Sequence, residues 1–233
     1  MAVYSQFDLI ALMAQPECPI CRLIQNDVRR FVDGLLYESS VDPSSQQKFR
    51  ASRGVCAVHS QLLRETRGYS VPMATLYEAA IDEVLSVLDS AGSLPVNKLR
   101  RNSGGRQISE KLKPSKRCPC CVTVEASERL YTQVFADGLA DHAFVQAFQQ
   151  SQGLCLTHVR RMMEHAMPQD ARTKFVQAQR AIWKKLLAEL DLFMARSGER
   201  GDGKPVGEEG TSWSRAVNVI GGLQNVFGSE YER

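Results

Sequence analysis

Six of the seven cysteines and two of the four histidines fall into two copies of the same pair of short motifs. Cys-Pro-x-Cys occurs at 18–21 and at 118–121, and Gly-x-Cys-x-x-His occurs at 54–59 and at 153–158. Thiolate and imidazole groups are ligands that zinc prefers in proteins. The motifs therefore predict metal sites built from eight residues: Cys18, Cys21, Cys56, His59, Cys118, Cys121, Cys155 and His158.

The motifs belong to a longer internal repeat. Residues that follow Cys18 match those that follow Cys118 at an offset of 100, and residues 41–59 match residues 140–158 at an offset of 99. The matches include pairs that are not candidate ligands, such as Asp42 with Asp141. Self-similarity of this kind indicates a repeated structural unit, here present twice in tandem.

Both motifs are placed so that their side chains can meet at helix starts. Cys-Pro-x-Cys opens an apolar run with helical spacing, so we expect Cys18 at the N-cap, followed by proline in the first turn. The partial positive charge of a helix start favours thiolates, the form that binds metal. Cys56 and His59 are three residues apart and would share one helical face.

Each copy contains three cysteines and one histidine, so we expect each repeat to close its own site. The alternative is a swapped arrangement that pairs Cys18 and Cys21 with Cys155 and His158. Four protein ligands leave no open position for a catalytic water, which favours a structural ion. The two ligand pairs are separated by 34 residues in the first copy and 33 in the second, a spacing typical of no common zinc finger.

Two zinc ions are the predicted cofactors, and an iron–sulfur cluster is the alternative. One histidine among cysteines also suits some clusters, and the sequence does not separate the two. A purely packed set of cysteines would leave the repeated histidines unexplained. Cys120, whose counterpart is Ile20, is interpreted as a packed thiol because a ligand should recur in both copies.

Apolar residues at helical spacing predict an all-α protein with two tandem helical repeats, each clamped by a Cys3His metal site, and a C-terminal amphipathic helix. We expect about four helices in each copy, with one over residues 71–88 and with Asp42 and Asp141 as helix N-caps. The predicted organisation is a first repeat at 1–97, a basic linker at 98–116, a second repeat at 117–196, and a glycine-rich linker with an amphipathic tail at 197–233.

Composition is that of an ordinary globular protein. The 233 residues are 43% hydrophobic and 24% charged, with a net charge of +3 that does not by itself call for nucleic acid or an anionic membrane. The N-terminus lacks the basic region of a secretory signal, and no apolar run reaches the length of a membrane span. We therefore expect a cytoplasmic protein, where paired cysteines are more often metal ligands than disulfides.

Several other features have less specific interpretations. No phosphate loop, G-x-S-x-G, G-x-G-x-x-G or H-E-x-x-H motif occurs, which lowers the expectation of an enzyme. His142 and His165 have no histidine counterparts and are expected at the surface. The tail places five apolar side chains on one face, which we expect to pack on the protein itself and not on a membrane: Trp213, Val217, Ile220, Leu223 and Phe227.

Three functions compete at this point. The leading hypothesis is a non-enzymatic interaction or adaptor module, in which metal-clamped helical units present a surface to a protein partner. The second is an iron–sulfur or thiol-based redox protein. The third is a nucleic-acid-binding regulator that uses the basic linker, although residues 98–117 lack aromatic side chains that could stack on bases.

The paired CPIC/CPCC and GVCAVH/GLCLTH motifs, together with SWSRAVNVIGG near the C-terminus, resemble an uncharacterised bacterial family that is classed as a domain of unknown function. The resemblance covers nearly the whole chain. It implies no activity, but it supports the repeat and the motif positions. The chain departs from that pattern in Cys120 and in the long basic linker.

Overall fold

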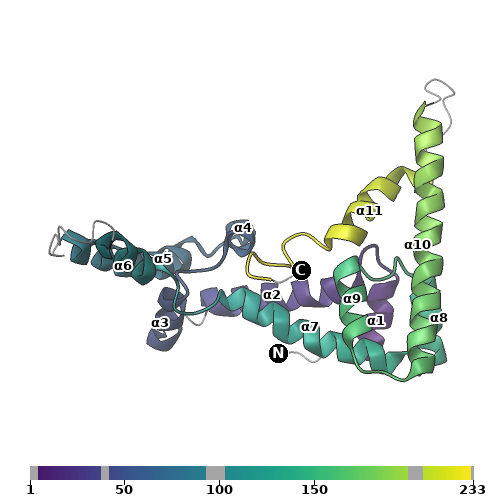
Figure 1. The fold of residues 1–233 in the computed structure, drawn as a ribbon, viewed down its shortest axis with the longest axis horizontal. Helices are drawn as coiled ribbons and strands as arrows, with labels where there is room; N and C mark the ends of the chain where they lie inside the picture. Colours follow the sequence, from purple (N-terminus) through teal and green to yellow (C-terminus); the bar gives the residue numbers. More distant parts are fainter. Residues whose placement is uncertain (1–4, 38–41, 93–102, 199–206, 232–233) are drawn as a thin grey trace. The chain divides into compact units, whose positions relative to one another are not determined.

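The computed structural model describes residues 5–37, 42–92, 103–198 and 207–231, and every regular element in these ranges is helical (Figure 1). This confirms the all-α prediction. The elements are α1 (Gln6–Met13), α2 (Pro19–Tyr37), α3 (Pro43–Ala51), α4 (Ala57–Glu65), α5 (Ser70–Gly92), α6 (Ser103–Leu112), α7 (Pro119–Gly138), α8 (His142–Gln150), α9 (Leu156–Glu164), α10 (Gln169–Gly198), the 3-10 helix η1 (Glu208–Thr211) and α11 (Ser212–Gly221).

The chain forms two compact units that do not follow its order. Unit 1 comprises Met1–Asp27, Val124–Phe227 and Arg233, and unit 2 comprises Val28–Thr123 and Gly228–Glu232. The division cuts α2 and α7, so the start of α2 belongs with the end of α7, and the end of α2 with the start of α7. The expected repeats at 1–97 and 117–196 are therefore not the compact units.

Helix length explains why a repeat does not close on itself. The 19 residues of α2 carry the chain about 27 Å away from Cys18, and the nine residues of α3 span only about 13 Å. The chain therefore arrives at α4 in the unit that also holds the start of α7. The same holds for α7, whose start lies in unit 2 and whose end lies in unit 1.

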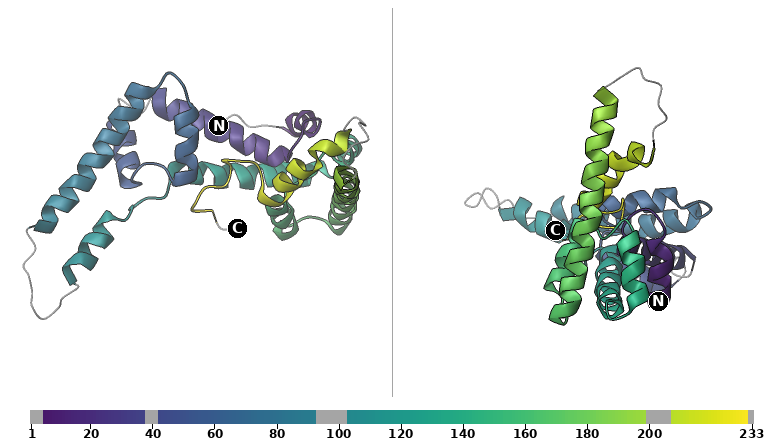
Figure 2. Two further views of the ribbon diagram at one scale, coloured as in Figure 1. Left: turned by 90° about the horizontal axis from the view of Figure 1, so that it is seen from above. Right: turned by 90° about the vertical axis from the view of Figure 1, so that its right-hand side faces the viewer.

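Unit 1 has an aromatic core. The Phe135 ring meets those of Phe144 and Phe148 edge to face, with centroids 5.1 and 5.0 Å apart, and Phe148 stacks on Phe175 of α10. Both α10 and α1 pack against α8 (Figure 2). Asp27 of α2, which is buried, accepts hydrogen bonds from Ser127 Oγ and Tyr131 Oη of α7 at 2.6 and 2.7 Å. Unit 1 is thus held by residues of both predicted repeats.

Unit 2 is built on α5, against which α3 and α6 pack. The Phe49 ring of α3 meets Tyr77 of α5 edge to face at 5.1 Å. Asp42 caps α3 by accepting from the N–H groups of Ser44 and Ser45, and Asp141 caps α8 in the same way, as predicted. The range 98–116, expected to be a linker, contains α6. Lys113, directly after this helix, forms an ion pair with Glu110 inside it.

The C-terminal amphipathic segment differs from its prediction. Trp213, Val217 and Ile220 are 56%, 63% and 63% exposed, so the apolar face of α11 points to solvent. The opposite face is anchored by polar contacts, in which Arg215 bonds Glu189 and Gln152 of unit 1. Gly222, with φ +80°, ends the helix, so Phe227 lies beyond it and is buried separately. No helix in the described ranges is long and apolar enough to cross a membrane.

Candidate metal centres

The eight predicted ligands come together in two groups of four that could hold a metal ion, one group in each unit. Within each group all ligand atoms lie within 4.8 Å of one another. We name Cys18, Cys21, Cys155 and His158 site 1, and Cys56, His59, Cys118 and Cys121 site 2. The expectation that each repeat closes its own site is therefore wrong, and the swapped arrangement is the observed one.

Site 1 lies in unit 1 and is buried at every ligand. His158 Nδ1 lies 3.4 Å from both Cys18 Sγ and Cys21 Sγ, and 3.3 Å from Cys155 Sγ. The sulfurs of Cys21 and Cys155 are 3.6 Å apart. The imidazole nitrogen thus faces three sulfurs that surround one small space.

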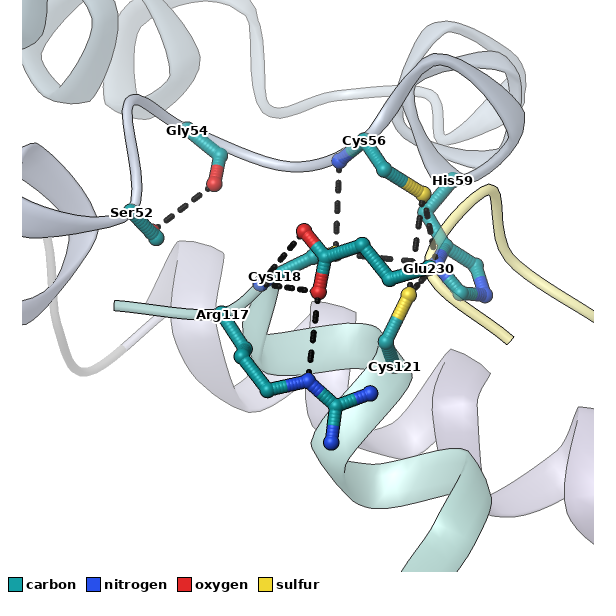
Figure 3. Close-up of polar contacts among 8 residues, drawn as sticks. All are labelled: Ser52, Gly54, Cys56, His59, Arg117, Cys118, Cys121 and Glu230. Atoms are coloured by element: carbon teal, nitrogen blue, oxygen red, sulfur yellow. Dashed lines mark hydrogen bonds and ion pairs between the residues drawn. The ribbon is translucent and has the colours of Figure 1, made fainter. Parts of the chain in front are cut away.

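Site 2, in unit 2, repeats this geometry (Figure 3). His59 Nδ1 lies 3.3 Å from Cys56 Sγ and 3.6 Å from the sulfurs of Cys118 and Cys121, and the sulfurs of Cys56 and Cys121 are 3.8 Å apart. Three of its ligands are buried. Cys56 is half-buried, which makes it the most accessible of the eight.

The two motifs position these side chains at four helix starts. The carbonyl groups of Cys18 and Cys118 accept the first hydrogen bonds of α2 and α7, from Arg22 and Val122. Cys56 and Cys155 are the N-caps of α4 and α9, and neither side chain makes a capping hydrogen bond. Their sulfurs are therefore available to bind metal. They lie at helix starts, where the partial positive charge favours thiolates.

The glycine of Gly-x-Cys-x-x-His turns the chain into the helix that carries the ligands. Gly54 and Gly153 have φ of +85° and +75°, a conformation that L side chains rarely adopt. A Cβ atom at Gly153 would lie 2.7 Å from the Gln179 side chain, and one at Gly54 would lie 3.0 Å from Tyr77. A side chain at either glycine would therefore strain the turn that lies two residues before the ligand cysteine.

The thiols and imidazoles polarise each other. Burial lowers the pKa of His59, but hydrogen bonds with the Cys118 and Cys56 thiols outweigh burial and raise that pKa to about 9. Burial raises the pKa of Cys18, but hydrogen bonds with Cys155 and Cys21 outweigh it, so the pKa lies well below its ordinary value. Without metal, each set of four ligands favours a thiolate beside a protonated imidazole. A bound metal cation would replace the protons of the ligands.

The surroundings of site 1 include a carboxylate. Glu128 is buried, and its Oε1 lies 3.4 Å from His158 Nε2, the nitrogen that faces away from the sulfurs. Arg161 approaches the other oxygen of Glu128 at 3.3 Å. A carboxylate behind a histidine ligand fixes the ring orientation and raises its basicity. The Phe227 ring lies 5.5 Å from the His158 ring and covers it.

The ligands of site 2 are instead held by backbone N–H groups and by residues of the C-terminal segment. The Cys56 N–H donates to Cys118 Sγ at 3.3 Å, and the Cys118 N–H donates to the Glu230 carboxylate at 3.0 Å (Figure 3). Gly228 lies against the ligands, because a Cβ atom there would be 2.3 Å from Cys121 Sγ and 2.7 Å from His59 Cε1. His59 Nε2 is buried and has no hydrogen-bond partner among the residues that the structure describes.

Sequence reasoning missed Glu128, Gly228 and Glu230. Glu128 had a signal, because it falls on the apolar face of α7 between the buried residues Val124 and Tyr131. An acid on a buried helical face needs a partner. Gly228 and Glu230 had none, since they lie outside the repeat and meet the site only through the fold.

The remaining candidate residues lie outside both groups. Cys120 is completely buried, as predicted for a packed thiol, and its counterpart Ile20 is buried too. Neither His142, which is exposed, nor the half-buried His165 belongs to a site.

Comparison with known proteins supplies a family and no activity. A protein described as "Uncharacterized 23.9 kDa protein in xynA 3'region", from Caldicellulosiruptor sp. (strain Rt8B.4), is 22% identical over 222 residues, which cover 93% of this chain and all of that protein. No solved structure matches the chain. The family of unknown function DUF6062 matches residues 9–225, nearly the whole chain. The chain belongs to the DUF6062 family.

Proposed function

We propose that sites 1 and 2 each bind one zinc ion that stabilises its unit, and that the protein is a non-enzymatic interaction module. The spacing of the ligand atoms carries this proposal. Tetrahedral zinc, with Zn–S of about 2.3 Å and Zn–N of about 2.0–2.1 Å, places its sulfurs about 3.8 Å apart and sulfur about 3.6 Å from nitrogen. The S–S distances of 3.6–3.8 Å and S–N distances of 3.3–3.6 Å are close to these values.

The same spacing favours a single ion over an iron–sulfur cluster. A cluster distributes its ligands over two or more irons, which separates ligands on different irons by the width of the cluster. All ligand atoms of each group lie within 4.8 Å. The cavity of about 10 Å³ that borders Cys18 and Cys155 has room for one water at most and is too small for a substrate.

The interaction role is supported by α11. Its exposed side chains Trp213, Val217 and Ile220 form a stripe about 10 Å long on a helix that is anchored through its polar face. Exposed apolar stripes on well-anchored helices mark interaction sites more often than scattered apolar residues do. A photo-crosslinking residue at Val217 should capture a protein in the native cell, whereas one at Phe7, a single exposed apolar side chain of α1, should not.

Metal analysis combined with circular dichroism tests the main proposal. Protein purified without added metal should be colourless and hold about two zinc ions per chain. A strong chelator should then lower the helical signal at 222 nm, and zinc should restore it, because the free energy of binding is coupled to folding. Brown protein that contains iron, or helical signal that survives metal removal, would contradict the proposal.

A further inference from the structure

Unit 2 has an open pocket whose lining contains none of its metal ligands. Its volume is about 360 Å³, and it lies where the second half of α2, α3 and the start of α7 meet. Most of its lining is apolar, with one hydroxyl and one ammonium group. The lining includes Phe31, Leu35, Ser45, Lys48, Phe49 and Pro119.

The matching positions of the second repeat form a closed core. At the offsets of the sequence repeat, Phe31, Leu35, Ser45 and Phe49 correspond to four aromatic residues that are completely buried in unit 1: Tyr131, Phe135, Phe144 and Phe148. Leucine and serine thus replace two phenylalanines in unit 2. In the second repeat, the two phenylalanine rings fill the space that corresponds to the pocket of unit 2.

The cover over this space differs as well. In unit 1, α1 packs against α8 and buries Leu9 and Met13. In unit 2, α6 stands before the second Cys-Pro-x-Cys as α1 stands before the first, but it packs mainly against α5. The lining of the pocket therefore faces solvent on one side.

We propose that this pocket binds a small aromatic carboxylate. Its volume lies in the range of about 300–1,000 Å³ that is usual for small-molecule sites, and a cavity of about 150 Å³ already accepts benzene. Phe31, Phe49 and Leu35 provide the apolar walls for a ring. Among the residues that the structure describes, Lys48 supplies the only charge of the lining, and a carboxylate is its complement.

The neighbouring acid does not oppose this assignment. Asp42 is absent from the lining, and its carboxylate accepts hydrogen bonds from the N–H groups of Ser44 and Ser45 at 3.3 and 3.0 Å. Its negative charge is thus held at the start of α3. The pocket is independent of the metal proposal, because none of its lining residues is a candidate ligand.

Calorimetric titration of the metal-loaded protein with 3-phenylpropanoate provides the test. We expect a Kd on the order of 0.1–1 mM, as befits a ligand of this size. The matched alcohol, 3-phenylpropan-1-ol, should bind about tenfold more weakly because it lacks the charge that Lys48 recognises. Absence of measurable heat up to 10 mM, or equal binding of the alcohol, would overturn the proposal.

Ser45→Phe restores the ring that the second repeat has at this position. It should fill the pocket, weaken 3-phenylpropanoate binding at least tenfold, raise the Tm by about 2–4 °C and leave the metal content unchanged. Gln47→Phe, on the exposed side of α3, is the control and should change neither binding nor Tm. If Ser45→Phe lowers the Tm, or binds the ligand as the unchanged protein does, the pocket is not the site.

Discussion

Sites 1 and 2 share one ligand set and one spacing but differ in what surrounds them. Site 1 is buried at all four ligands, and the Glu128 carboxylate stands behind its histidine. Site 2 has a half-buried Cys56 and a cover from the segment that begins at Gly228.

The difference shows that the ligands are repeated in both copies of the sequence, whereas the residues that support them are not. Glu128 corresponds to Val28, so the carboxylate at site 1 has no counterpart in the first repeat. Supporting carboxylates increase metal affinity, and burial slows exchange with solvent. We therefore expect site 1 to retain its ion and site 2 to exchange it.

Gly228→Ala should give the largest difference between the sites. A Cβ atom at this position would lie 2.3 Å from Cys121 Sγ, so the C-terminal segment or the ligand must move. Metal analysis should find about one ion per chain, held at site 1. Gly105→Ala in α6, where a Cβ atom meets nothing within 4 Å, should keep both ions. Full occupancy in Gly228→Ala would show that the segment does not constrain site 2.

Glu128→Gln should weaken site 1 alone. Loss of a carboxylate behind a histidine ligand typically costs 10–100-fold in metal affinity. Competition with a chelator of known affinity measures the effect, and Glu164→Gln, which removes an exposed partner of Arg161, is the control. An unchanged affinity would mean that Glu128 serves only its ion pair with Arg161.

The pH dependence of site 2 follows from His59. Its pKa of about 9 in the metal-free protein means that below pH 9 a proton must leave before the imidazole can bind metal. The zinc affinity of site 2 should therefore rise at least tenfold per pH unit from 7 to 9, because the Cys121 thiol, whose pKa is raised by hydrogen bonds with Cys118 and Cys56, must lose its proton as well. At an ordinary histidine pKa of about 6.5 the contribution of His59 would already have levelled off. Zinc competition in the Cys18→Ser variant isolates site 2. A flat profile above pH 7 would contradict the raised pKa.

Cys120→Ala should have the smallest effect. The thiol is buried beside Cys118 but is not one of the four ligands, and its counterpart Ile20 shows that the position serves packing. Both ions should remain, with a modest loss of stability. Loss of the site 2 ion would instead make Cys120 a ligand, and Cys121→Ala would then retain the ion.

Features encoded by neighbouring residues were predictable from the sequence. The caps Asp42 and Asp141 and the helix starts at Pro19 and Pro119 rest on contacts within a few positions. The eight candidate ligands are marked by two short motifs. The all-α class follows from apolar spacing along single helices.

The pairing of the ligands and the exposure of α11 were not predictable in this way. Pairing depends on the direction in which α2 carries the chain, which the repeat does not specify. The apolar stripe of α11 predicts packing, but the part-buried contacts of Arg215 with Glu189 and Gln152 decide which face is anchored. Long-range contacts of this kind cannot be predicted from the spacing of apolar residues in the sequence.

The swapped pairing is tested most directly by metal stoichiometry in two double variants. Cys18→Ser with Cys155→Ser removes two ligands from site 1 alone, so about one ion per chain should remain. Cys18→Ser with Cys56→Ser removes one ligand from each site, so both ions should be lost or held far more weakly. The reverse outcome, with one ion retained in the second variant and none in the first, would show that each repeat closes its own site and would contradict the arrangement described here.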